Sequence, residues 1–354
     1  MRVRFDGGYS MNPLSEQHIL KSRNQIKSIV FLGISTFVLA LIAMGQGPYE
    51  KLDIWTTAKM IFGFETPTST EHSIIWRIRF PRILMAIVGG VALATAGALM
   101  QGCLGNPLVS PLTLGVASGA ALGAAVAIML GFSVIGGQLA IIGNAFLFAL
   151  VVVFIIIQLG STHSVSAESY ILVGIAITFI AGAITSVLNY FATDEQVSQL
   201  MHWSFGSLGR VDRDTAMFLT FPVLSLVPLA LKWSWDLNAL SVGGDEFAIS
   251  TGVDPAGFRK TVLVLSALLT ALVISFTGLI GFVGLAAPHM ARVIVGNDFR
   301  KLIPSSAIFG AFLMLFADTL GRTLFAPIII PVGVMLSVIG GPFFMYLLIR
   351  SKGR

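Results

Sequence analysis

The chain has 354 residues and a formal net charge of +5, with 55% hydrophobic but only 11% charged residues. Soluble domains are about one quarter charged, so this composition excludes the soluble protein classes. It indicates an integral membrane protein, with membrane lipid around it and no nucleic-acid partner. A spanning helix needs about 20 apolar residues, and uncharged runs of that length recur along the sequence.

The first 28 residues are polar and basic, and an apolar run begins at Ile29. A cleaved signal peptide has a shorter apolar core and a small-residue cleavage site. We therefore expect residues 1–28 to form a cytoplasmic amino-terminal extension. The first spanning helix is predicted at about 29–45 and stays uncleaved.

After Arg82 the next charged residue is Glu168. This run is too long for two crossings with short loops, so it predicts three helices. Breaks at Gly105-Asn106-Pro107 and at 131–137 place them at about 83–103, 108–130 and 139–159.

Further uncharged runs predict the remaining crossings, and the long run at 261–291 predicts a helix, a bend and the start of a second crossing because glycines and Pro288 interrupt it. The other predicted helices lie at about 170–191, 215–231, 302–317 and 323–349. The fold class is thus an all-α integral membrane protein with about ten transmembrane helices. Its single domain covers 29–350, with a cytoplasmic loop at 232–260 and a cytoplasmic tail at 351–354.

Ten crossings put both termini on one side of the membrane. With the amino terminus in the cytoplasm, the inner segments hold 14 of the 22 basic residues, as the positive-inside rule predicts. The outer segments nevertheless contain Arg77, Arg79, Arg82 and Arg322. Two interpretations remain open: these arginines reach the interface from helix ends, or they form an acceptor patch for an acidic partner outside the membrane.

The spans contain few of the carboxylates that couple transport to ion gradients. Asp318 lies near the outer end of a span and Glu168 near the inner end of another. The sequence also has no G-x-x-x-x-G-K-[ST] loop, so we expect no nucleotide hydrolysis by that route and no enzyme activity. The energy for any transport is expected to come from elsewhere.

A metal site is not expected, because the chain has one cysteine, Cys103, and His163, His202 and His289 share no ligand spacing. No cofactor is expected either. The inner loop contains VGGDEFAISTGVD at 242–254, which predicts a short helix. Asp245 and Glu246 would complement its dipole and Gly252 would end it.

Several ordered motifs resemble one family. These are RFPR at 79–82, AGALMQGCLGNPLVSPLTLGVASGA at 96–120, W-x-x-G-S-L at 203–208, GDEFAISTGVD at 244–254, GFVGLAAPHMAR at 281–292 and ADTLGR at 317–322. With them, the chain resembles the FecCD-type permease subunits of type II ABC importers for iron-siderophores, haem and cobalamin. The break at Gly105-Asn106-Pro107 departs from the family pattern, because Gly105 stands where the family has a charged residue.

The resemblance implies a homodimer with the translocation path along its interface, two cytoplasmic ATPase subunits, an extracytoplasmic substrate-binding protein and a metal-chelate substrate. It assigns binding-protein docking to Arg79, Arg82 and Arg322. ATPase coupling falls to Gly244, Asp245, Glu246, Phe247, Ile249 and Gly252. The cytoplasmic gate corresponds to Ser161, Thr162, Ser164 and Ser166, and we assign Asn189, Gln101 and Asn106 to the path.

The expected function is therefore that of a permease in the prokaryotic cytoplasmic membrane, working by alternating access, with ferric siderophore as the first choice of cargo. The cargo itself stays open among siderophore, haem, cobalamin and oxyanions. An ion-gradient-driven secondary transporter is the alternative, and it would keep working without a partner ATPase. A structural or channel-like membrane protein is the third reading and predicts passive flux.

Overall fold

The computed structural model describes residues 13–49, 52–160 and 166–351, and in these ranges it contains helices and no strand. A π-helical segment at Ile74–Arg79 continues directly into α4. The helices are α1 (Pro13–Gly45), α2 (Ile54–Ile61), α3 (Ser69–Ser73), α4 (Phe80–Cys103), α5 (Val116–Leu130), α6 (Ala140–Gly160), α7 (Ala167–Phe191), α8 (Asp194–Ser204), α9 (Arg213–Lys232), α10 (Ser234–Ser250), α11 (Pro255–Thr277), α12 (Val283–Val295), α13 (Phe299–Thr323) and α14 (Val332–Ser351).

Seven helical segments in the described part of the chain are long and apolar enough to cross a membrane. Three shorter apolar helices, in α5, α12 and α14, add to them. Together they accommodate the ten predicted crossings, and the all-α membrane fold is confirmed.

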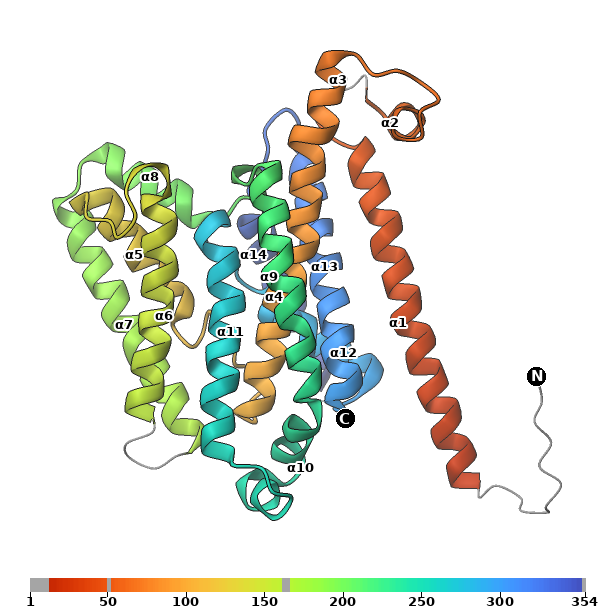
Figure 1. Cartoon of the computed structure of the whole chain (residues 1–354), viewed down its shortest axis with the longest axis vertical. Helices are drawn as coiled ribbons and strands as arrows, with labels where there is room; N and C mark the ends of the chain where they lie inside the picture. The colour runs from red at the N-terminus through yellow and green to blue at the C-terminus, as the bar shows by residue number, and fades with distance from the viewer. Residues whose placement is uncertain (1–12, 50–51, 161–165, 352–354) are drawn as a thin grey trace.

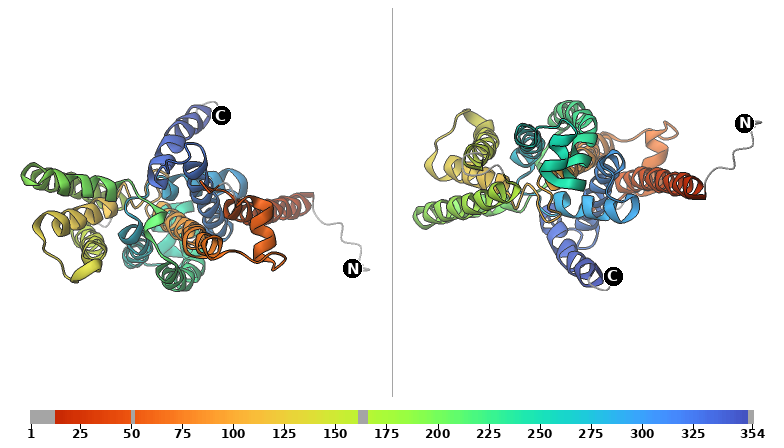
Figure 2. Two further views of the ribbon diagram at one scale, coloured as in Figure 1. Left: turned by 90° about the horizontal axis from the view of Figure 1, so that it is seen from above. Right: turned by 90° about the horizontal axis from the view of Figure 1, so that it is seen from below.

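The bundle is built around α4, which packs against α9, α11, α12 and α13. Helices α5 to α8 form a lobe on one side and α1 lies on the opposite side (Figures 1 and 2). Helix α10 lies at one end of the bundle, and both the start of α1 and the end of α14 point toward it (Figure 1). Helices α2, α3 and α8 lie at the opposite end. From the distribution of basic residues we call the α10 end inner and the α3 end outer.

Small residues let α4 occupy this central position. A Cβ at Gly97 would overlap the carbonyl oxygen of Gly284 in α12, and a Cβ at Gly90 would overlap that of Gly310 in α13. Close backbone approach of this kind is how helices associate in lipid, where little hydrophobic force acts between them. The small-residue pattern of α4 is therefore explained by two helix crossings.

Helix α1 begins at Pro13, well before the apolar run, so the predicted start at residue 29 is wrong. The polar turns of α1 are held by the inner ends of α12 and α13. The Gln25 Nε2 donates to the Val295 carbonyl at 2.8 Å, and the Lys301 Nζ donates to the Gln25 Oε1 at 2.7 Å. These contacts extend the helix beyond its apolar segment.

The helix predicted at 108–130 is also wrong in its first part, because residues 107–115 form turns and α5 begins only at Val116. Pro107 and Pro111 cannot donate helical hydrogen bonds. The Asn106 side chain instead accepts the Leu108 backbone N–H at 2.9 Å. This polar reverse turn keeps the break at 105–107 where the sequence predicted it.

Two further boundaries differ from expectation. The polar segment after α7 folds into α8, whose first turn is closed by a reciprocal capping box between Thr193 and Gln196. The last helix begins at Val332 rather than residue 323, because α13 continues to Thr323 and two prolines, Pro327 and Pro331, interrupt the connection. The bend between α11 and α12 is confirmed.

The crossing of α4 and α12 predicts the effect of one added methyl group. Gly97→Ala should lower the free energy of unfolding by about 1–3 kcal/mol, the usual range for overpacking, because the Cβ meets backbone rather than a flexible side chain. The melting temperature of the purified protein in detergent checks this.

The matched control is Gly33→Ala in α1, where an added Cβ has no atom within 4 Å. It should leave the melting temperature unchanged or raise it slightly, because alanine favours helix more than glycine does. Equal melting temperatures for the two variants would contradict the proposed close crossing.

Candidate functional site

The outer end of the bundle contains a buried group of ionic side chains, here called the outer arginine cluster: Arg79, Arg82, Asp318 and Arg322. Asp318 lies on α13 and is completely buried. Its Oδ1 accepts the Arg82 Nε at 2.7 Å, and its Oδ2 accepts the Arg322 Nε at 3.0 Å. One carboxylate thus joins α4 to α13.

The same cluster also fastens the outer end of α1. The Arg79 Nη1 donates to the Met44 carbonyl at 2.6 Å, and the Arg322 Nη1 donates to the Gln46 carbonyl at 2.9 Å. Because the last carbonyls of a helix have no partner within the helix, these guanidinium groups satisfy acceptors that would otherwise be buried and unpaired.

The three arginines are only 3–6% exposed, so the interpretation that they reach the membrane interface is wrong. The cluster contains three arginines and one carboxylate, which pairs with Arg82 and Arg322. The Nη2 atoms of Arg79 and Arg82 have no hydrogen-bond partner among the described residues. An acidic partner would therefore find unused donors here, but only by reaching below the surface of this chain. Docking at these residues stays a prediction.

The inner end presents the segment predicted to contact an ATPase. Gly244 has φ +68° and ψ −160°, a backbone conformation that residues other than glycine rarely adopt. It bends the chain sharply within α10. The short helix after it, Asp245–Ser250, is here called the coupling helix, and Gly252 follows its end with φ +88°. The short helix predicted from the sequence is present.

The coupling helix exposes an apolar surface. Phe247 is 46% and Ile249 is 62% exposed, and Glu246 is exposed beside them. A hollow of about 430 Å³ lies next to Phe247, lined by Trp235, Asp236, Asn238, Ala239, Val242, Thr251 and Val253. Exposed apolar side chains beside a hollow are typical of a protein-binding surface.

Sequence reasoning missed the partner of Asp245. The Asp245 carboxylate binds Arg259 of α11 through both oxygens, and Arg259 is 4% exposed. From the sequence, Arg259 counted only as one more basic residue of an inner loop. Its place at the start of an uncharged span was a signal that it had to have a partner.

The predicted gate is described only in part. Ser161, Thr162 and Ser164 lie outside the described residues. Ser166 precedes α7, and its hydroxyl accepts the Ser169 backbone N–H at 3.4 Å as the helix cap. The gate role of all four residues stays a prediction.

The structure does not bring the three predicted path residues together. Gln101 is buried at the inner end of α4 and lines a hollow of about 270 Å³ with Arg292. Asn106 is used in the turn described above, and Asn189 lies near the far end of α7. The Oδ1 of Asn189 is buried, with no partner in the described part of the chain. The path assignments stay predictions.

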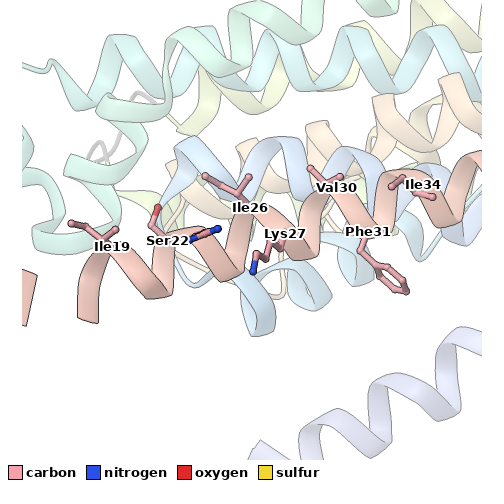
Figure 3. Close-up of a pocket in the computed structure, with 8 residues that line it drawn as sticks. Ile19, Ser22, Ile26, Lys27, Val30, Phe31 and Ile34 are labelled. Atoms are coloured by element: carbon pink, nitrogen blue, oxygen red, sulfur yellow. The ribbon is translucent and has the colours of Figure 1, made fainter. Parts of the chain in front are cut away.

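A hollow of about 650 Å³ lies along α1 (Figure 3). Every residue that lines it comes from α1, with Ile26, Val30 and Ile34 following one another along the helix. A small-molecule site gathers polar groups from several elements. This surface is therefore better explained as one face of α1, polar around Ser22, Arg23 and Lys27 and apolar beyond them, where it would be exposed to lipid.

Removing the shared carboxylate of the outer arginine cluster should be costly. Asp318→Asn leaves Arg82 and Arg322 buried without their anion, and breaking a buried ion pair in this way costs about 3–5 kcal/mol. We expect a marked fall in melting temperature in detergent and faster proteolysis between α1 and α2, because the same arginines hold the end of α1.

Asp214→Asn is the control, since Asp214 is an exposed carboxylate at the outer end in the first turn of α9. Its loss should change stability by less than about 0.5 kcal/mol, as for most surface substitutions. If the Asp318 variant melts like this control, the cluster does not hold the outer end together.

Comparison with known proteins identifies the family of this chain. The model of the FecCD transport family matches residues 34–350. The hemin transport system permease protein HmuU of Yersinia pestis is 37% identical, covering 93% of this chain and 98% of its own. The vitamin B12 import system permease protein BtuC of Klebsiella pneumoniae is 33% identical, covering 98% and 99%.

A solved structure, described as a metal-chelate type ABC transporter in an inward-facing conformation, is 30% identical with a TM-score of 0.78. The match covers 92% of this chain and 99% of that chain. Sequence and fold therefore agree along almost the whole length. The chain belongs to the FecCD transport family of ABC importer permeases, which are multi-span proteins of the prokaryotic cytoplasmic membrane.

Proposed function

We propose that the chain is the membrane subunit of an ATP-driven, binding-protein-dependent importer for a metal chelate. The observation that carries the proposal is the coupling helix, which leaves Phe247 and Ile249 uncovered at the inner end. The chain has no phosphate-binding loop of its own, so this surface would receive the subunit that hydrolyses ATP. Each copy of the chain would bind one such subunit.

A homodimer is part of the proposal. Helix α7 exposes large apolar side chains along its length, including Leu172 at 67%, Phe179 at 74% and Tyr190 at 84%. A second copy of the chain would cover this face, and the translocation path would lie between the two copies. The path would open alternately to either side because each ligand favours one state of the dimer.

The cargo class is supported by the relatives, which are named for hemin and vitamin B12 transport. Both names point to a large metal chelate, so we propose ferric siderophore, haem or cobalamin as the cargo. The binding protein would deliver it to the outer end, with its acidic residues directed at the outer arginine cluster. The chain would form and break no covalent bonds.

Proteoliposomes test the driving force. With the ATPase and ATP inside and the loaded binding protein outside, the wild-type chain should accumulate chelate, and ionophores that collapse ion gradients should not stop it. Uptake that needs the gradient but neither ATP nor the ATPase would show the alternative, a secondary transporter. Leakage of chelate without either energy source would show a channel.

Phe247→Ala in the same system tests the docking surface. Loss of an apolar anchor from an interface often costs about 1–4 kcal/mol of binding, so less ATPase should copurify and ATP-driven uptake should fall. Phe221→Ala removes a phenylalanine of α9 that is even more exposed, at 77%, and serves as the control. Unchanged copurification and uptake in the Phe247 variant would contradict the docking role.

A further inference from the structure

Arg259 joins elements that lie far apart in the sequence. It is in the second turn of α11, and its Nε donates to the Cys103 carbonyl, the last residue of α4, at 2.9 Å. Its Nη1 donates to the Asp245 Oδ2 at 2.8 Å, and its Nη2 donates to the Asp245 Oδ1. One side chain therefore connects the coupling helix to the inner end of the central helix.

The two partners have different exposure. The side chain of Asp245 is 42% exposed on the coupling helix, whereas that of Arg259 is 5% exposed. A subunit that moves the coupling helix would therefore move a carboxylate whose cation is fixed inside the bundle. Solvent at the exposed Asp245 carboxylate screens the pair, so holding the fold together is a weak explanation for it.

The chemistry of this position favours arginine. A guanidinium keeps its charge when buried and presents a planar set of donors that fits a carboxylate through two hydrogen bonds. Here a third donor, the Nε, is left for the Cys103 carbonyl. That carbonyl is at the carboxyl end of α4, where helix carbonyls lack partners and carry partial negative charge. An ammonium group could not hold both partners in this geometry.

We propose that Arg259 is the positioning residue that transmits movement of the coupling helix to the inner end of α4. The proposal rests on the proposed function, since it requires an ATPase that acts on the coupling helix. A shift of Asp245 pulls the guanidinium, which is also bound to the last residue of α4. Without this connection the ATPase still binds and hydrolyses ATP, but the bundle responds less.

The test measures chelate uptake and ATP hydrolysis together in proteoliposomes that contain the ATPase and the binding protein. Arg259→Gln removes the charge, Asp245→Asn removes the anion but leaves Arg259 on Cys103, and the double variant removes both. We expect each to transport about five- to tenfold less chelate per ATP, a change within the range seen for residues that couple distant sites. ATPase copurification and melting temperature should stay near the wild-type values.

The double variant should be no worse than either single variant, because residues that act through one shared contact are not additive. Arg259→Lys should recover only part of the coupling. Lys260→Gln, which loses the same charge at the next residue of α11, should transport normally.

A wild-type ratio of chelate transported per ATP in Asp245→Asn would overturn the proposal. So would a double variant whose loss in this ratio equals the product of the losses of the two single variants. If the variants instead fail to bind the ATPase, the pair supports docking and the transmission role is wrong. The wild-type protein tests the proposed function separately. If it shows no ATP-driven uptake, the proposed function is wrong, whatever the variants do.

Discussion

Asp318 is the anion on which the outer half of this bundle depends. It holds Arg82 and Arg322 inside a membrane protein, where an unpaired charge is expensive. Arg82 joins α4 to α13 through this carboxylate, and Arg322, with Arg79, holds the end of α1. Farther along α4, Gly90 and Gly97 let the helix pack backbone against backbone on α13 and α12.

Helix α4 connects this outer cluster to the inner end. Arg82 lies in its first turn and Cys103 is its last residue, so one continuous helix has an ionic contact at the outer end and a guanidinium bound to its final carbonyl at the inner end. Close crossings at Gly90 and Gly97 fix the helix against α13 and α12 between these points. Such a helix can move as a rigid unit, which suits the proposed opening to one side at a time.

The sequence was enough for the number of crossings, the break at 105–107, the family and the short helix after Gly244, because these depend on composition and local motifs. Burial of Arg79, Arg82 and Arg322 could not be predicted, since their contacts join helices far apart in the chain. The spacing of Asp318 and Arg322 by four residues was a local signal of one ion pair. Arg259 shows the limit most clearly, because neither Asp245 nor Cys103 can be identified as its partner by spacing.

The central claim is that two copies of this chain form a path whose ends open alternately under the control of ATP. Cys103 is the single cysteine, so Cys103→Ala gives a background in which one spin label per chain can be placed, at Leu172 near the inner end of α7 or at Tyr190 near its outer end. Pulsed electron spin resonance on the complete transporter then measures the distance between the two copies. We predict that ATP shifts the Leu172 pair and the Tyr190 pair in opposite directions. Absence of any distance between labels, or distances that ATP leaves unchanged at both ends, would contradict the claim.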